Sequence, residues 1–281
     1  MAKRFILWAA VFLGIYGPPF RNVHAEQLPL WEVGAGFAAI DFPVYRGSDE
    51  RRSYLLPVPY FSYNGEVLKI SRERARALFF KSERAELDVS VNGSVPAKSS
   101  DTVARRGMPD LEATFELGPS LNLHLYRDED GRTLLDVRLP WRAAFATNLQ
   151  HLYDIGWLFQ PQLDLDLKDI YHQGWNMGFV VGPIFADRRY HQYFYNVDPQ
   201  YVTPTRPAYT ARGGYSGSQF ILALSKRYPG YWSGGFMKWD DLDGAVFADS
   251  PLVTSKRYFT IGWAITWILD RSDTMVDVDD N

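Results

Sequence analysis

The chain has 281 residues, no cysteine and a formal net charge of −3 at pH 7. It can therefore form neither a disulfide framework nor a thiolate metal site, and its charge argues against nucleic acid as a partner. Aromatic side chains make up 16% of the residues, which is rich for a water-soluble domain and typical of a membrane barrel with aromatic girdles. After residue 25 no uncharged apolar run approaches the length of a helical span, which argues against a helical membrane protein.

The first 25 residues have the pattern of an export signal. Lys3 and Arg4 precede an apolar run at residues 5–16, and Val23 and Ala25 are small residues at positions −3 and −1 of a cleavage site. An uncleaved membrane anchor is the alternative. It is disfavoured because the apolar run has about a dozen residues, whereas a helical span needs roughly twenty. We therefore predict a cleaved signal peptide at residues 1–25.

Alternation of apolar and polar residues predicts strands along the rest of the chain. The clearest case is QLDLDLKD at residues 162–169, where three leucines share one face and two aspartates and a lysine share the other. In a membrane barrel the leucines would meet lipid and the charges would line a wet interior. The segment 54–63 contains two prolines, which should confine it to a strand end or a bulge. The other predicted strands are 31–41, 66–72, 78–80 continuing to 86–92, 111–117, 121–126, 135–145, 175–185, 219–228, 231–240 and 259–269.

Short turns and long polar loops separate these strands. The turns include Asn-Gly at 64–65 and Pro-Gly at 229–230, and the longest loop, 186–210, has a helical turn near 190–195. We predict an all-β fold: an antiparallel transmembrane β-barrel of about 12 strands, range 10–14, with short periplasmic turns and longer extracellular loops. The barrel should occupy residues 26–269. A secreted β-sandwich would explain the alternation equally well, but it leaves the outward tryptophans of the last strand unexplained.

Residues that could carry chemistry are scattered. No serine is spaced from a histidine so that both would lie on one face of one strand, and His172 and His191 could meet only through tertiary folding. The aspartates at 164, 166 and 169, and those at 240, 241 and 243, lack the ligand spacing of a calcium loop. Paired carboxylates for glycoside cleavage stay open, because many acids would share the interior. We therefore expect no enzyme, no metal and no cofactor.

Three irregular segments distinguish this chain from other barrels with alternating strands. They are YRGSD at 45–49 with LPVPY at 56–60, YHQYFYNV at 190–197 with RPAYTARGGYSG at 206–217, and DGAVFADSPLV at 243–253. In this order they resemble the signatures of the MipA/OmpV family of outer-membrane proteins. The resemblance implies an outer-membrane barrel. For the family's namesake it implies a scaffold that joins a lytic murein transglycosylase to a bifunctional murein synthase.

One feature departs from the usual barrel pattern. Outer-membrane barrels commonly end on an aromatic residue that the barrel-assembly machinery reads, whereas this chain continues past Leu269. We interpret residues 270–281 as an acidic, disordered tail.

Three functions follow as hypotheses. The first is the scaffold, in the outer-membrane lipid, with the transglycosylase and the synthase as partners and the assembly machinery as a transient one. The second is a narrow channel for small solutes, and the third is a hydrolase of lipid or murein. Because function concentrates on loops held by a rigid scaffold, partner contact or plugging of the lumen is expected of loop residues. The candidates are Tyr45, Arg46, Asp49, Tyr190, Tyr193, Tyr195, Arg206, Asp249, Ser250 and Pro251.

Overall fold

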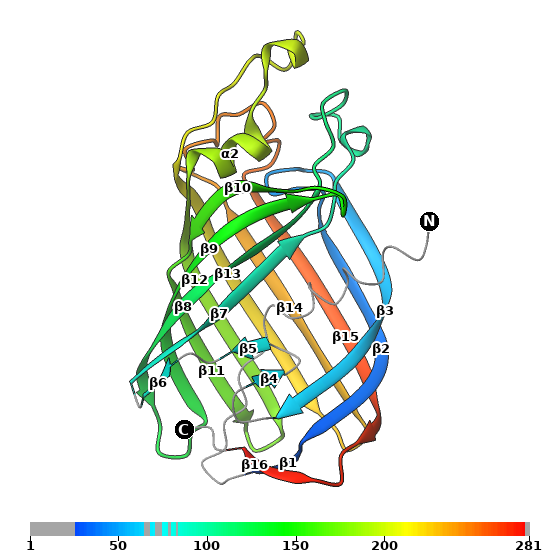
Figure 1. The fold of residues 1–281 in the computed structure, drawn as a ribbon, viewed down its shortest axis with the longest axis vertical. Helices are drawn as coiled ribbons and strands as arrows, with labels where there is room; N and C mark the ends of the chain where they lie inside the picture. The colour runs from blue at the N-terminus through cyan, green and yellow to red at the C-terminus, as the bar shows by residue number, and fades with distance from the viewer. Residues whose placement is uncertain (1–25, 65–67, 71–74, 78–79, 83, 279–281) are drawn as a thin grey trace.

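A computed structural model describes residues 26–64, 68–70, 75–77, 80–82 and 84–278. Its main element is one antiparallel sheet that curls into a tall barrel (Figure 1). The predicted all-β barrel is therefore confirmed. The strands of this sheet are β2 (Trp31–Pro43), β3 (Arg51–Asn64), β4 (Leu68–Ile70), β5 (Ala75–Ala77), β6 (Phe80–Lys81), β7 (Ala85–Ser94), β8 (Ala113–Arg127), β9 (Thr133–Thr147), β10 (Leu152–Phe159), β11 (Gln162–Ile170), β12 (Trp175–Ala186), β13 (Gly214–Arg227), β14 (Tyr231–Asp241) and β15 (Arg257–Arg271).

The strand count agrees with the prediction of about twelve. β10 and β11 follow one another in the chain, and both pair antiparallel with β9 and with β12. Together they therefore occupy one strand position in the sheet. The short strands β5 and β6 lie at the two ends of the hydrogen-bonded order and follow one another in the chain. Strand β15 pairs with β2, which brings the last long strand beside the first.

The chain ends differ from the expected tail. The last barrel strand continues to Arg271, and β16 (Met275–Val278) pairs antiparallel with β1 (Glu26–Pro29). Residues 275–278 thus form a strand where the sequence predicts a disordered tail, because this segment pairs its backbone with β1. This small sheet lies at the short-turn end of the barrel (Figure 1). The predicted signal peptide, residues 1–25, lies outside the described residues.

The two prolines of β3 stand in the middle of the strand, and the expectation that they mark an end or a bulge is wrong. Pro57 pairs with Phe37 and Pro59 with Ala35, within a β2–β3 ladder that is registered from Arg51 to Tyr63. Because the two prolines are two residues apart, their missing N–H groups face the same neighbour. On the side away from β2, the described pairing of β3 is confined to Tyr63 and Asn64, so the prolines interrupt no described ladder there.

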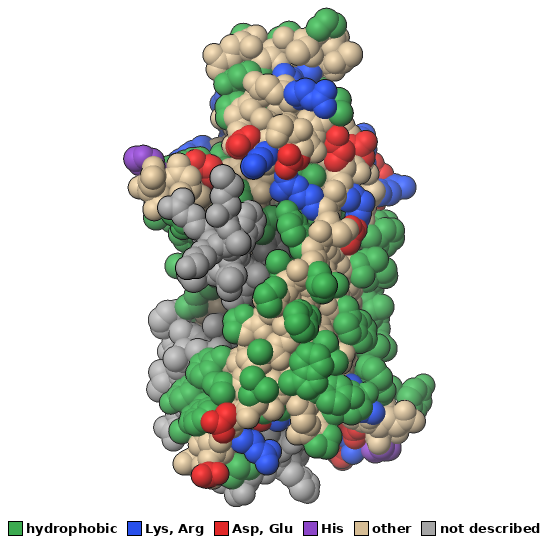
Figure 2. Space-filling view, turned by 90° about the vertical axis from the view of Figure 1, so that its right-hand side faces the viewer, with side chains coloured by type: hydrophobic (Ala, Val, Ile, Leu, Met, Phe, Trp, Pro, Cys, Tyr) green, Lys and Arg blue, Asp and Glu red, His purple; other side chains and the backbone are tan. Residues whose placement is uncertain are grey.

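The two faces of the sheet divide as the leucine–aspartate alternation predicts. Asp164, Asp166 and Lys168 are buried on the inner face of β11, whereas Leu163 is 42% exposed on the outer face. On β15, Trp263 and other outward side chains are likewise exposed. Figure 2 shows hydrophobic side chains along the barrel wall, with charged side chains gathered toward its two ends. This distribution matches a wall that faces lipid and an interior that holds charge.

The loops at the two ends differ in length. At one end lie short turns such as 128–132 and 228–230; at the other end lie longer connections at 44–50, 95–112, 187–213 and 242–256. The longest connection contains the helix α2 (Arg188–Tyr195), where a helical turn was expected, and the 3₁₀ turn η3 (Pro199–Tyr201). The loop 95–112 contains the turn η2 (Ser99–Asp101). Among the described residues, no helix has the length and apolar character to cross a membrane.

Local sequence determines where α2 begins. The Asp187 side chain accepts a hydrogen bond from the backbone N–H of Tyr190 at 2.9 Å, which caps the helix N-terminus. Gly156 of β10 allows this cap to approach. Its φ is +120°, and a Cβ at that position would lie 2.1 Å from the Asp187 carboxylate.

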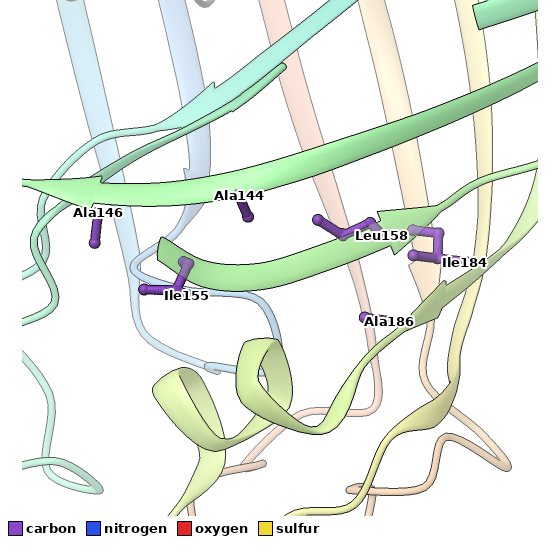
Figure 3. Close-up of a cluster of buried hydrophobic side chains, with 6 residues drawn as sticks. All are labelled: Ala144, Ala146, Ile155, Leu158, Ile184 and Ala186. Carbon is purple, nitrogen blue, oxygen red and sulfur yellow. The ribbon is translucent and has the colours of Figure 1, made fainter. Parts of the chain in front are cut away.

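A small apolar cluster seats the helix against the barrel wall. It consists of Ala144, Ala146, Ile155, Leu158, Ile184 and Ala186, from β9, β10 and β12 (Figure 3). Aromatic side chains of α2, among them Tyr190 and Phe194, pack against it. The alanines leave room for these rings, and each buried Ile or Leu contributes roughly 1.5–3 kcal/mol.

Candidate functional site

The long loops fold together into one cap over the end of the barrel. Tyr195 at the end of α2 stacks on Phe247 of the 242–256 loop, with ring centroids 3.7 Å apart and planes inclined by 8°. Both side chains are almost fully buried, and Leu242 and Ala211 join the same cluster. We call the packed loops 44–50, 95–112, 187–213 and 242–256 the cap. Apolar burial is what holds these four loops in place.

Buried hydrogen bonds join the cap loops to one another. The Tyr45 hydroxyl donates to the carbonyl of Leu252 at 2.6 Å, and the Tyr195 hydroxyl donates to the carbonyl of Arg46 at 2.9 Å. Ser250 Oγ donates to the carbonyl of Tyr195 at 2.9 Å. Three loops that are distant in sequence are thereby linked by side chains that satisfy buried carbonyls.

Arg206 joins the outer part of the cap. Its guanidinium donates to the carbonyls of Ala104 and Arg106 at 2.8 and 3.0 Å, and to that of Tyr201 at 2.8 Å. Because a guanidinium carries five donors in a fixed planar arrangement, one side chain can satisfy several carbonyls from two loops at once. Arg206 is therefore a clamp between the loops 95–112 and 187–213.

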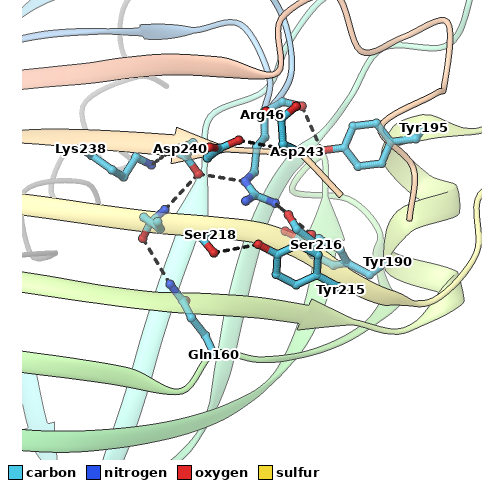
Figure 4. A network of polar contacts seen from close by, with 12 residues as sticks. Arg46, Gln160, Tyr190, Tyr195, Tyr215, Ser216, Ser218, Lys238, Asp240 and Asp243 are labelled. Carbon is cyan, nitrogen blue, oxygen red and sulfur yellow. Dashed lines mark hydrogen bonds and ion pairs between the residues drawn. The ribbon is translucent and has the colours of Figure 1, made fainter. Parts of the chain in front are cut away.

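Beneath the cap, polar side chains cross the barrel interior from strand to strand. Arg46 Nε donates to Asp240 Oδ1 at 3.0 Å, and Arg46 Nη1 donates to the carbonyl and hydroxyl of Ser216 at 2.5 and 2.9 Å (Figure 4). Gln219 also donates to Asp240, at 3.3 Å, and Gln160 donates to Gln219 at 3.2 Å. The carboxylate of Asp240 thus anchors the first loop of the cap to β14.

The same network continues on the opposite wall. Arg142 donates to Gln160 at 2.7 Å and to Glu116 at 2.9 Å, and the Tyr190 hydroxyl of α2 donates to Glu116 at 3.2 Å. All of these groups lie inside the barrel, where a hydrogen bond to a charged group is stronger than in water. Helix α2 is therefore bound to the wall by polar as well as apolar contacts.

The protonation states in the cap follow from burial and from neighbouring charge. Burial of the Arg46 guanidinium opposes its charge, but coulombic attraction, to which the Asp240 carboxylate contributes, prevails and raises the pKa of Arg46. Burial raises the pKa of the Tyr195 hydroxyl, so it stays a neutral donor. Burial also lowers the pKa of His191 to about 4, which leaves this imidazole uncharged at neutral pH.

A cavity of about 180 Å³ lies between the cap and the network. Tyr190 and Phe194 of α2 line one side of it, and Arg46, Lys238 and Tyr258 line another. The cavity has both apolar and charged walls, which are the features of a site for a small polar molecule.

The candidate loop residues all lie in the cap, but in different roles. Tyr45, Tyr195, Arg206 and Ser250 are buried joints of the cap, as described above. Tyr193 accepts a hydrogen bond from the Glu112 N–H at 2.9 Å.

The remaining candidates lie nearer the surface. Asp49 is exposed and accepts a hydrogen bond from the Thr254 hydroxyl at 2.6 Å. Asp249, also exposed, accepts one from the Tyr209 hydroxyl at 2.5 Å. The hydrogen bond from Tyr209 lowers the pKa of the Asp249 carboxyl. Pro251 is half-buried. Asp49 and Asp249 are thus placed where a partner could reach them.

The possible catalytic and cation-binding groups do not assemble. His191 belongs to α2 in the cap, whereas His172 lies in the turn at the far end of β12, so the two histidines are at opposite ends of the barrel. Asp241 and Asp243 both pair with Arg257. Among the residues that the structure describes, no group of three His, Asp or Glu side chains could hold a metal ion.

Sequence reasoning missed several residues of the interior network. Glu116, Arg142, Gln160 and Gln219 look like ordinary polar positions of alternating strands. Asp240 was considered only as a cation ligand, and it is instead the partner of Arg46. The alternation of the strands could have indicated that these side chains lie on the inner face. It could not have shown which of them contact one another, because those contacts depend on strand register.

Two solved structures show a distant similarity to this chain. The NanC porin matches 85% of this chain and 100% of its own, at 7% identity and a TM-score of 0.35. The toluene transporter TodX of Pseudomonas putida matches 89% of this chain and 68% of its own, at 10% identity and a TM-score of 0.28. No curated protein matches the sequence.

The family comparison covers most of the chain. The family model described as "MltA-interacting protein MipA" matches residues 33–269. This range begins within β2, ends two residues before the end of β15 and includes every loop of the cap. The resemblance first read from the loop segments is thereby confirmed. With its barrel closed by β2 and β15 and its cap built from the family's own segments, this chain belongs to the MipA family of outer-membrane β-barrel proteins.

Proposed function

We propose that the protein is a non-enzymatic scaffold in the outer membrane that joins a lytic murein transglycosylase to a bifunctional murein synthase. The transglycosylase is the partner in the family's description, MltA-interacting protein. The synthase comes from what the resemblance implies for the family's namesake.

The observation that carries the proposal is the cap. Four loops, packed through buried aromatic rings and cross-loop hydrogen bonds, cover one end of the barrel. A barrel whose end is covered by packed loops suits a protein that holds others in place better than one that passes solutes. In bacterial barrels the short turns face the periplasm, so murein enzymes would meet the short-turn end.

Site-specific crosslinking tests this assignment. A photoreactive residue replaces Tyr171 or Asp130, which are exposed in the short turns, and Asp198 or Asp249, which are exposed in the cap, serve as matched controls. The full-length protein in outer-membrane vesicles is mixed with purified transglycosylase and synthase. We expect crosslinks from the short turns only, and co-elution of the two enzymes only when the barrel is present. Absence of crosslinks at both ends, or crosslinks from the cap alone, would refute the proposal.

The polar interior favours a second candidate, a narrow channel for small solutes. Asp164, Asp166 and Lys168 line the barrel and a cavity lies beneath the cap. Planar-bilayer recordings separate the two functions. Reproducible conductance steps would favour the channel, and silence would favour the scaffold.

A further inference from the structure

We propose that the cavity beneath the cap is a binding site for a small organic monoanion that also carries hydroxyl groups. The proposal does not depend on the scaffold function. It rests on three properties of the cavity: its size, its charge and two donors that make no good hydrogen bond.

The size sets the class of ligand. A cavity of about 150 Å³ is known to hold a six-carbon ring, and this cavity measures about 180 Å³. Its walls combine apolar groups such as Phe194 and Leu158 with polar groups such as Gln160 and Thr260. A compact molecule with apolar faces and a rim of hydroxyl groups fits both kinds of wall.

The charge of the cavity favours an anion. Arg46, Arg142 and Lys238 line it, and Glu116 is the one carboxylate among the lining residues. Glu116 is paired with Arg142. Arg46 and Lys238 share the carboxylate of Asp240 behind the wall, at 3.0 and 3.8 Å. Among the described residues, three cations therefore stand against two carboxylates, which leaves one positive charge in excess.

Two buried donors face each other at the cavity without forming a good hydrogen bond. Nη2 of Arg46 and the hydroxyl of Tyr258 each belong to a lining residue and interact with one another, but neither makes a well-formed hydrogen bond in the described part of the chain. The other nitrogens of Arg46 are held by Asp240 and Ser216, so Nη2 is the one left over. A buried donor without a partner costs about 1–3 kcal/mol, and a bound carboxylate and hydroxyl would satisfy both groups.

Paired sugars test the proposal. Isothermal titration calorimetry on the full-length protein in detergent compares glucuronate with glucose, which lacks the carboxylate. We expect saturable binding of glucuronate and at least tenfold weaker binding of glucose. No binding of glucuronate, or equal binding of both sugars, would overturn the proposal.

Two variants locate the ligand. Lys238→Met should weaken glucuronate binding at least tenfold, whereas Lys226→Met should not change it, because Lys226 contacts Trp175 and Tyr228 at the short-turn end of β13. Tyr258→Phe should weaken binding several-fold while the protein stays folded, because the hydroxyl makes no well-formed hydrogen bond within the described residues. Unchanged affinity in Lys238→Met and Tyr258→Phe, with both folded, would contradict the site.

Discussion

The Arg46–Asp240 pair ties the cap to the barrel wall, and its energetic role can be measured. The Asp240 side chain is 1% exposed and that of Arg46 is 22% exposed, with Nε and Oδ1 3.0 Å apart. Asp240→Asn keeps the shape of the side chain but leaves a largely buried guanidinium without its carboxylate. Removing one partner of a buried pair costs about 3–5 kcal/mol, and the partial exposure of Arg46 places the expected loss of stability at about 3 kcal/mol.

The reverse change should cost less. In Arg46→Met the Asp240 carboxylate keeps Lys238 at 3.8 Å and the Gln219 amide at 3.3 Å, so we expect a loss of about 2 kcal/mol. In the double variant both charges of the pair are removed, so neither charge is left buried without its partner. We therefore expect it to lose about 3 kcal/mol in total, which gives a coupling energy of about 2 kcal/mol.

Urea unfolding in lipid vesicles, followed by tryptophan fluorescence, measures the cycle. Asp241→Asn is the matched control: its partner Arg257 is 62% exposed, and a surface pair of this kind contributes about 0–1 kcal/mol. If Asp240→Asn costs no more than Asp241→Asn, or if the two single changes add to within about 0.5 kcal/mol, the pair does not anchor the cap.

Three further predictions concern the cap and the wall. Because the folded pKa of His191 is about 4 and the unfolded value is 6.5, the unfolded state takes up the proton first as pH falls, so stability present at pH 7 is lost between pH 6.5 and 4. By pH 4.5 the loss should reach about 2–3 kcal/mol relative to His191→Gln, measured by unfolding at pH 7 and pH 4.5. An identical pH dependence of the two proteins would disprove this prediction. Tyr45→Phe removes the hydroxyl that donates to the Leu252 carbonyl, so it should lower the free energy of unfolding by about 1–3 kcal/mol and speed proteolysis of the 242–256 loop. The control Tyr171→Phe changes a side chain that is 87% exposed and should have neither effect. Equal effects of the two changes would show that the hydrogen bond does not stabilise the cap. Ile265→Arg changes an outward residue near the middle of β15 and should lower the free energy of unfolding in vesicles by about 2–4 kcal/mol. Leu269→Arg, near the end of the strand, should lower it by only about 0–1 kcal/mol. A larger loss for Leu269→Arg would show that the middle of the bilayer does not lie at Ile265.

Much of the barrel could be predicted from the sequence, because a period of two is a local property of a strand. The run from Gln162 to Asp169 shows on its own which side chains share a face, and β11 has the charges inside and the leucines outside as expected. The approximate strand number and the helical turn near Tyr190 follow from equally local signals. The position of the β3 prolines within the strand could not be predicted in this way. A proline is tolerated in a strand where its missing N–H would have no partner, and that depends on the neighbouring strand.

The candidate site divides in the same way. The sequence placed Tyr45, Arg46, Tyr195 and Ser250 in irregular loops, and the family signatures made those loops specific. Only the tertiary structure decided what these residues do there. Arg46 and Asp240 are 194 positions apart. Their pairing depends on the closure of β2 against β15 and on the register of β13 and β14, which no local pattern encodes. Alternation determined the faces of the sheet, because side-chain direction in a strand repeats every two residues. Closure and register decided the network, the cap and the cavity, because those contacts exist only when distant strands have been brought side by side.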